Sequence, residues 1–465
     1  MTFPMSDYLR DYDVYPLVAK VGKEVTVHIR PTGRRPEFED GKKYSGQICA
    51  INGGTPANHP ATGDFRKFKA VYDAKNGFKV PVTFDSEQQY FIRFLNNEGK
   101  TIRAFPVYAV AEDLAGRLPL RGDMHIHTTC SDGRQTPEVV AANYRSHGYD
   151  FFAITDHHQY YPSIQAINFY KDIPTEFVIV PGEEVHLPAV NGQYASAHIV
   201  NFGGNYSINA MVQDEEFEEH HGAPALCSAV GECPKAMTMD EYCDKMEALA
   251  AAVEVPETID KIPAAVMKWA FNEIKKADGL AIFPHPHWIT NNTFHVPEEF
   301  VEYLMTEQDF DAFEVLGGER YFEHNGYQTL RYYEDKAKGR SYPIVGSTDS
   351  HNSYESAEGS LICSTVVFAP VNERKALINA VKDFYSVAID SISKEFRIVG
   401  DSRLVRYACF LCNYYFPRHD ELCVEEGRLM KICAVGTEEE KAEAMKTLAV
   451  INGRMKKFME KYLSF

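Results

Sequence analysis

Residues 122–133 read GDMHIHTTCSDG, and this stretch decides how the chain is interpreted. A short apolar run ends here on His125 and His127, whose side chains point to the same side of an extended backbone. Two imidazoles on one side could bind one metal ion, and Asp132 adds a carboxylate within the next turn. The pattern H-x-H alone is a weak signal, so its meaning depends on the rest of the chain.

Six further apolar runs carry residue types that bind metals at or near their ends. The runs are FFAITDHH (151–158), FVIVPGEE (177–184), ASAHIVNF (195–202), GLAIFPHP (279–286), AFEVLG (312–317) and PIVGSTDSH (343–351). Each has the length and composition of a buried strand. Because parallel strands converge at their carboxyl ends, the sequence predicts many nitrogen and oxygen donors around one point.

The pattern along the chain predicts three segments. Alternating β-pattern with a turn about every ten residues predicts a β-sandwich domain of immunoglobulin-like type over 1–117. Strand runs alternate with helix-period segments over 118–394, which predicts an α/β domain whose seven or so units close into a barrel. Within it, 205–260 is too long for a simple connection and is expected to be an insertion or lid. Residues 395–465 are expected to be mainly helical.

Composition limits the class of protein. The net charge of −18 argues against general nucleic-acid binding, since such proteins usually carry a basic surface. The first residues have no signal-peptide pattern, and no run of about 18 apolar residues occurs, so no membrane span is expected. The ten cysteines lack the spacing of a disulfide framework. A cytoplasmic location is therefore expected.

The motifs HIHTTCSDG, ITDHH, PGEE, the histidine of SAHIVNF, FPHP and STDSH resemble, in order, those of the PHP (polymerase and histidinol phosphatase) domain family. The resemblance covers about residues 120–390 and implies a distorted seven-stranded β/α barrel with three metal ions. It implies the following ligands: His125, His127, Glu184 and Asp349 for the first ion; Glu184, His198 and His285 for the second; Asp132, His157 and His351 for the third.

The function that this resemblance implies is that of a metal-dependent phosphoesterase, either a phosphatase or a phosphodiesterase. It would hydrolyse a small phosphorylated metabolite, a nucleotide or a sugar phosphate, by attack of metal-bound hydroxide. The histidine-rich ligand set suits two to three divalent ions of zinc, manganese or iron. A metal-dependent hydrolase of a non-phosphate bond and a non-catalytic metal-binding interaction protein remain as alternatives. The sequence also leaves a homo-oligomer open.

Several neighbouring residues are candidates for catalysis. His158 and His287 are expected to donate a proton or contact the phosphate. Arg134 and Arg320 are the candidate phosphate-binding cations. Cys130 lies between two ligand positions, but no other feature of the sequence indicates a nucleophile.

Other acidic residues and histidines have less direct roles. Glu183 is the alternative to Glu184 as the bridging ligand, although strand alternation turns it to the other side. Glu314, Asp123 and Asp156 are expected to orient ligands rather than to bind metal. The insertion contains His220 and His221, which are expected to be exposed or to contact a substrate as part of a lid.

Overall fold

The computed structural model describes residues 11–33, 37–52, 65–195, 197–213, 233–317, 322–354, 363–390 and 397–465. The chain divides into two compact units, each made of separate stretches of sequence. Unit 1 consists of Met1, Pro119–Asp401 and Cys423–Asn452, and unit 2 of Thr2–Leu118, Ser402–Leu422 and Gly453–Phe465. Within the described ranges, every helix is too short or too polar to cross a bilayer.

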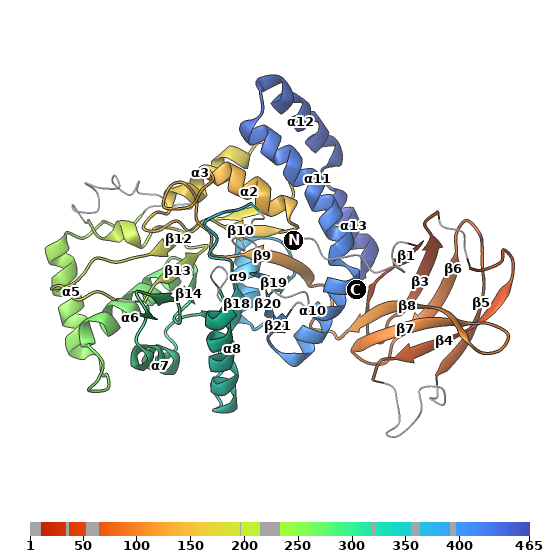
Figure 1. Cartoon of the computed structure of the whole chain (residues 1–465), viewed down its shortest axis with the longest axis horizontal. Helices are drawn as coiled ribbons and strands as arrows, with labels where there is room; N and C mark the ends of the chain where they lie inside the picture. The colour runs from red at the N-terminus through yellow and green to blue at the C-terminus, as the bar shows by residue number, and fades with distance from the viewer. Residues whose placement is uncertain are drawn as a thin grey trace. The chain divides into compact units, whose positions relative to one another are not determined.

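Unit 2 contains two β-sheets, most of whose strands are labelled in Figure 1. The antiparallel sheet β1–β3–β6 consists of β1 (Tyr12–Tyr15), β3 (Glu24–Pro31) and β6 (Phe78–Thr83). The second sheet has the order β22–β2–β8–β7–β4–β5. Its strands are β22 (Leu463–Ser464), β2 (Val18–Lys20), β8 (Thr101–Val110), β7 (Gln88–Leu95), β4 (Lys43–Ala50) and β5 (Arg66–Val71).

The alternation of β6 explains how the two sheets of unit 2 pack. Phe78, Val80 and Val82 are buried, whereas Lys79 between them is exposed, as period-two alternation requires. The ring of Phe78 stacks on Phe94 of β7, with ring centroids 3.9 Å apart. Since these rings come from different sheets, the sheets share one aromatic core. The immunoglobulin-like topology stays a prediction.

Helices from the C-terminal part of the chain also belong to unit 2. They are α10 (Ser402–Tyr414) and α13 (Arg454–Tyr462). Buried Asp13 of β1 accepts hydrogen bonds from Lys461 (2.6 Å) and Tyr462 (2.6 Å), and Arg418 lies 2.6 Å away. Burial raises the pKa of Asp13, but these partners together hold it below its ordinary value.

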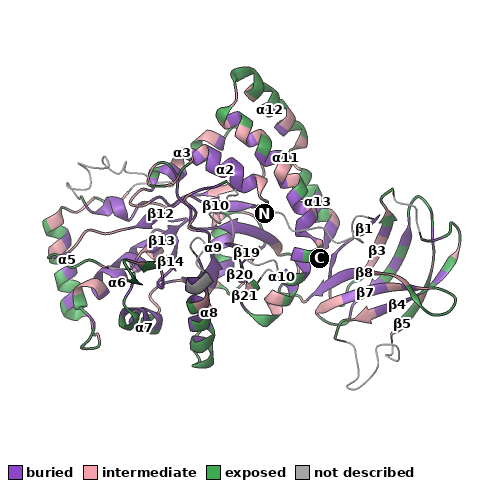
Figure 2. Ribbon diagram, in the orientation of Figure 1, coloured by how far each residue is buried: buried purple, intermediate pink, exposed green. Residues whose placement is uncertain are grey.

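Unit 1 contains two larger sheets, and their strands are mostly buried in Figure 2. One has the order β11–β10–β9–β19–β20–β21 and the other β12–β13–β14–β17–β18. The strands of the first are β9 (Leu118–Asp123), β10 (Phe151–Ala153), β11 (Val178–Val180), β19 (Cys363–Ala369), β20 (Ser386–Asp390) and β21 (Arg397–Val399). Those of the second are β12 (Gly182–Val185), β13 (Ile199–Phe202), β14 (Leu280–Phe283), β17 (Ala312–Leu316) and β18 (Ile344–Gly346).

Helices connect many of these strands, as the sequence pattern predicts. They are α2 (Pro137–Ser146), α3 (Tyr161–Tyr170), α5 (Met239–Ala252), α6 (Lys261–Lys276), α7 (Glu298–Glu307), α8 (Phe322–Ala337) and α9 (Arg374–Lys382). The short hairpin β15 (Ile289–Thr290) and β16 (Thr293–Phe294) precedes α7. The insertion contains the short helix η2 (Asn209–Met211) and α5, while its acidic stretch with His220 and His221 lies outside the described residues.

Two helices follow near the end of the chain, α11 (Phe416–Val435) and α12 (Glu438–Ile451). Residues 423–435 of α11 and all of α12 belong to unit 1. The fully buried guanidinium of Arg145 on α2 donates to Glu426 of α11 at 2.7 and 2.9 Å and to Asp150 at 3.2 Å. Because a buried cation is costly unless it is paired, these bonds fix α11 against α2.

The mixed α/β architecture is as predicted, but the strands do not form the single closed seven-stranded barrel that was expected. In the described part of the chain they form two open sheets, joined at isolated bridges between Ile126 and Ser350 and between His157 and Glu184. Pro181 separates β11 from β12 at the point where the chain passes from one sheet to the other. Proline has no N–H to donate, so the ladder breaks there.

Candidate metal centre

One reversed strand carries its ligand to the same edge of the sheet as its neighbours. β13 runs antiparallel to β12 and β14, so its beginning lies beside their carboxyl ends. His198 directly precedes β13, whereas Glu184 lies at the end of β12 and His285 follows β14. The alternation of strands and helices predicts a parallel strand around His198. The strand is antiparallel, and this direction still brings the imidazole to the same edge.

All nine predicted ligands converge, with the six imidazoles around the three carboxylates. The most buried of these is Glu184, whose side chain has 0% exposure. Its Oε2 faces three ring nitrogens: His157 Nδ1 at 2.6 Å, His125 Nε2 at 3.5 Å and His127 Nε2 at 3.6 Å. Its Oε1 faces two more: His198 Nδ1 at 2.7 Å and His285 Nε2 at 3.4 Å. One carboxylate therefore lies between two groups of imidazoles.

The carboxylate of Asp349 forms the second point of convergence. Its Oδ1 lies 2.9 Å from His127 Nε2 and 3.3 Å from His125 Nε2. Its Oδ2 lies 4.0 Å from His285 Nε2. Asp349 has a left-handed backbone with φ of 50°, and its N–H donates to the carbonyl of His125 at 2.9 Å. This bond fixes the loop after β18 against the loop after β9.

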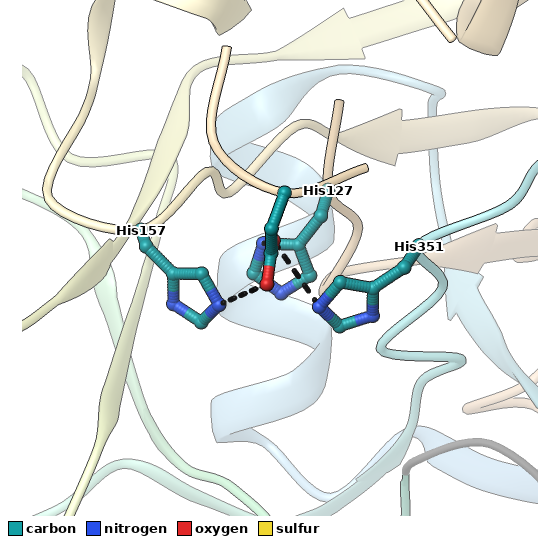
Figure 3. Close-up of side chains that lie close together, drawn as sticks. His127, His157 and His351 are labelled. Atoms are coloured by element: carbon teal, nitrogen blue, oxygen red, sulfur yellow. Dashed lines mark ion pairs between the residues drawn. The ribbon is translucent and has the colours of Figure 1, made fainter. Parts of the chain in front are cut away.

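The third carboxylate, Asp132, is half-exposed at 55% and marks the open side of the centre. Its oxygens lie 3.5 Å from His157 Nε2, 3.3 Å from His351 Nε2 and 4.0 Å from His127 Nδ1. Figure 3 shows the imidazoles of His127, His157 and His351 converging from three different loops. A Cβ on the neighbouring Gly133 would lie 2.6 Å from the backbone of His127, so only glycine fits in this loop.

The buried polar atoms of the centre are the type that a cation would satisfy. Among the described residues, both oxygens of Glu184 and the ring atoms His125 Nε2, His127 Nδ1 and His198 Nδ1 are buried without a hydrogen-bond partner. Buried polar atoms in folded proteins are nearly always hydrogen-bonded or bound to a metal. The donor set therefore fits divalent metal ions.

The pKa shifts of the three carboxylates also indicate a metal site. Burial raises the pKa of Glu184, but the imidazoles of His198 and His157 hold it well below its ordinary value. Burial opposes ionisation of Asp349 and Asp132 in the same manner, and neighbouring imidazoles lower the pKa of both. All three carboxylates are thus anions at neutral pH, as metal ligands must be.

Other acidic side chains position the ligands. Glu314 Oε2 lies 3.1 Å from His125 Nδ1, which leaves Nε2 of that ring for the centre. Buried Asp123 accepts from the backbone N–H groups of His125 (3.1 Å) and Thr348 (3.2 Å). Burial raises the pKa of Asp123 to about 7. Asp123 thus positions the backbone of His125 rather than its ring.

Asp156 organises the loop that carries Asp132. Its Oδ1 accepts the backbone N–H of Thr128 at 2.7 Å, and its Oδ2 accepts the hydroxyl of the same residue at 2.6 Å. The hydroxyl of Ser131 donates to it as well, at 2.5 Å. Asp156 therefore holds the loop backbone, not an imidazole.

Glu183 faces away from the centre, as strand alternation predicts. It accepts four hydrogen bonds, from Asn201 Nδ2 (3.0 Å), Ser207 Oγ (2.6 Å), Ile208 N (2.5 Å) and Asn209 Nδ2 (2.9 Å). Burial, the largest influence, raises its pKa. Its carboxylate is fully used in fixing the segment after β13.

The predicted catalytic residues lie in different surroundings. His158 has a left-handed backbone with φ of 61°, and its ring lies 4.6 Å from that of His186. Burial lowers the pKa of His158 to about 3. His287 turns instead to Glu298 of α7, at 3.3 Å, and lines a cavity of about 1050 Å³ between α7 and α8. Arg134 is exposed, and its N–H donates to the carbonyl of His351.

One predicted residue cannot be placed, and one residue of the centre was missed by the sequence analysis. Arg320 lies outside the described residues. His186 was not predicted, yet its Nε2 lies 3.4 Å from Glu184 Oε2 and 2.9 Å from His157 Nδ1. The sequence did contain the signal, because residues 184 and 186 of an extended chain share a side. With His186, six imidazoles surround the carboxylate of Glu184.

No family model matches the chain, and no curated protein matches its sequence. Among solved structures, a two-domain protein of Bacteroides vulgatus that contains a predicted PHP-like metal-dependent phosphoesterase is 16% identical, with a TM-score of 0.41. The match covers 63% of this chain and 69% of that one. The chain is similar to solved PHP-like metal-dependent phosphoesterases.

Two other similar structures extend the comparison. One, from Bifidobacterium adolescentis and assigned as a metal-dependent phosphoesterase, is 18% identical with a TM-score of 0.33, and the match covers 52% of this chain and 90% of that one. The other is endonuclease Q in complex with a 27-mer duplex bearing an abasic lesion, 10% identical with a TM-score of 0.30 and 57% of each chain covered. This similarity contradicts the expectation that the protein does not bind nucleic acid in general. Nucleic acid is therefore not excluded as a substrate. Net charge describes the whole surface, whereas nucleic-acid binding depends on the local site.

Proposed function

We propose that the protein is a metal-dependent phosphoesterase that hydrolyses the phosphate ester of a small metabolite, a nucleotide or a sugar phosphate. The observation that carries this proposal is the buried carboxylate of Glu184, which lies between two groups of imidazoles without hydrogen bonds to satisfy it. A bridging carboxylate of this kind is typical of sites that hold two metal ions close together.

Two to three divalent ions fit the donors. His125, His127 and Asp349 would hold the first together with Oε2 of Glu184, because these atoms face one another at 2.9–3.6 Å. His198 and His285 would hold the second together with Oε1. Asp132, His157 and His351 would hold the third. Zinc, manganese and iron suit these mixed nitrogen and oxygen donors.

When bound, the ions would polarise the phosphoryl group and lower the pKa of a coordinated water toward about 7. The side chains of the chain itself supply the rest. The position held by Asp132, His157 and His351 would admit the phosphate from solvent. Arg134, two residues after Asp132 in the same exposed loop, would attract the negative charge. His158, which lines a cavity of about 440 Å³ with His186 and His198, would contact the phosphate as a neutral imidazole, because its lowered pKa leaves it without the extra proton at neutral pH.

The test is metal analysis and a substrate panel on protein purified without chelator. The panel contains phosphate monoesters, phosphodiesters, an abasic DNA duplex and amides, each assayed before and after metal removal and replacement. We expect metal-dependent release of phosphate from monoesters. Fewer than one metal ion per chain after reconstitution, or turnover of amides alone, would contradict the proposal.

A further inference from the structure

His186 forms a compact group of donors with two residues already placed in the centre. Its Nε2 lies 2.9 Å from His157 Nδ1 and 3.4 Å from Glu184 Oε2, and the latter two atoms are 2.6 Å apart. Ligands bound to one ion at about 2.0–2.2 Å lie roughly 3–3.5 Å from one another. The 3.4 Å distance fits such a pair, and the two shorter distances would lengthen when an ion binds among the three atoms. The backbone N–H of His186 donates to Asn209 Oδ1 at 2.9 Å, which fixes its position.

We infer that His186 is a tenth metal ligand and that, with Glu184 and His157, it forms a metal position beyond those of the nine-residue set. Two imidazoles and one carboxylate are a ligand set that catalytic zinc and non-haem iron sites use, with the remaining positions open to water or substrate. This inference rests on the metal centre proposed above, and it adds one position to that centre.

A simple hydrogen bond between the two rings explains less of the geometry. His157 Nδ1 carries at most one proton, which can satisfy His186 Nε2 at 2.9 Å. Oε2 of Glu184 is buried at only 2.6 Å from the same nitrogen, yet it has no aligned hydrogen bond among the described residues. A cation held by the three atoms would satisfy all of them.

The new metal position is separate from the one formed by Asp132, His157 Nε2 and His351. His157 faces Asp132 with Nε2, at 3.5 Å, and faces Glu184 and His186 with Nδ1. The two ring nitrogens of one imidazole point in different directions, so His157 links two sets of donors. Holding an ion at each nitrogen would make the ring an imidazolate, with its N–H proton released to water. The cavity of about 440 Å³ is lined by His186 and provides room for the exchangeable ligands of such an ion.

The test measures metal binding rather than catalysis. Stoichiometry and affinity are determined for Zn²⁺ and Co²⁺ on the full-length protein, with Co²⁺ absorption as a probe of the ligands. Variants are His186→Ala, His186→Cys, Asp132→Asn and the double variant His186→Ala/Asp132→Asn. The matched control is His295→Ala, because His295 lines the same cavity and contacts His198 by its ring at 4.4 Å.

We expect His186→Ala to weaken one class of metal sites by at least about 100-fold, because loss of an outer partner alone lowers metal affinity about 10- to 100-fold. Asp132→Asn should weaken another class, so that the double variant shows both losses. His186→Cys should restore binding with a thiolate-to-cobalt absorption band, a result that mere packing could not produce. His295→Ala should bind as the wild type does.

The outcomes distinguish failure of this inference from failure of the proposed function. If the wild type binds metal and His186→Ala binds it with equal affinity and an unchanged spectrum, His186 is not a ligand and the inference is overturned. If the losses in the double variant do not exceed those of one single variant, the two groups are one position. A wild type that binds no metal would instead refute the proposed function. Thermal unfolding of each metal-free variant shows whether it is folded.

Discussion

Replacing Glu183 and Glu184 one at a time by glutamine separates the two roles that adjacent carboxylates have on β12. The side chains leave the strand on opposite sides: one accepts four hydrogen bonds from polar groups, and the other lies among imidazoles. Glutamine keeps the volume of the side chain but replaces one anionic oxygen by an NH₂ donor. The two substitutions should therefore affect different measurable properties.

For Glu183→Gln, the expected loss of stability follows from the hydrogen bonds that Oε2 accepts. This oxygen accepts from Ser207 Oγ at 2.6 Å and Asn209 Nδ2 at 2.9 Å. An NH₂ group there would face the amide of Asn209 donor to donor, while the hydroxyl of Ser207 could turn to accept. Hydrogen bonds to a charged group contribute about 1.5–3 kcal/mol each. We expect the free energy of unfolding of the metal-free protein to fall by about 2–4 kcal/mol, with little change in metal affinity.

For Glu184→Gln, we expect a loss of metal affinity. A neutral amide offers one oxygen and no charge where two ions would share a carboxylate. Since loss of an outer partner alone lowers metal affinity 10- to 100-fold, loss of this ligand should lower it by at least about 100-fold, or about 2.7 kcal/mol. Urea unfolding measures stability, and competition with a chromophoric chelator measures affinity. If Glu183→Gln weakened metal binding as much as Glu184→Gln, the assigned register of β12 would be wrong by one residue.

Three further predictions concern stability and the loop of Asp132. Arg145→Met should lower the free energy of unfolding by about 3–5 kcal/mol in urea titrations, because it leaves the buried Glu426 carboxylate without its cation; an unchanged value would contradict this pairing. Gly133→Ala should weaken metal binding, whereas Gly326→Ala, where a Cβ meets no atom within 4 Å, should not, and equal affinities would refute the loop argument. Asp13→Asn should cost roughly 3 kcal/mol at pH 7. Because the folded pKa of Asp13 is lowered, this difference from the wild type should shrink as the pH falls below about 4, and a difference independent of pH would exclude the ion pairs as its cause.

Much of the centre follows from local sequence signals. A polar residue at the end of a buried strand is carried to the edge of the sheet wherever the strand pairs, so the strand pattern was enough to predict that donors gather there. The resemblance to the PHP family supplied the choice of nine ligands. Period-two alternation was enough to turn Glu183 and Glu184 to opposite sides. Applied one step further, the same rule would have found His186.

The rest depends on contacts between distant parts of the chain. The direction of β13 is set by its pairing with β12 and β14, and nothing within the run ASAHIVNF records it. His287 turns to Glu298, a residue of a helix that follows the β15–β16 hairpin. The break between the two sheets arises at Pro181, whose effect depends on which strands lie beside it. Local patterns do not contain these pairings.

One feature of unit 2 has a consequence for the order of events during synthesis. Strand β22, residues 463–464, pairs with β2 near the other end of the chain, and the N–H of Leu17 donates to the carbonyl of Tyr462 at 2.8 Å. A ribosome releases the last of these residues more than four hundred positions after the first. The strands of unit 2 that are made first therefore stay without part of their packing until α10, α13 and β22 have been synthesised.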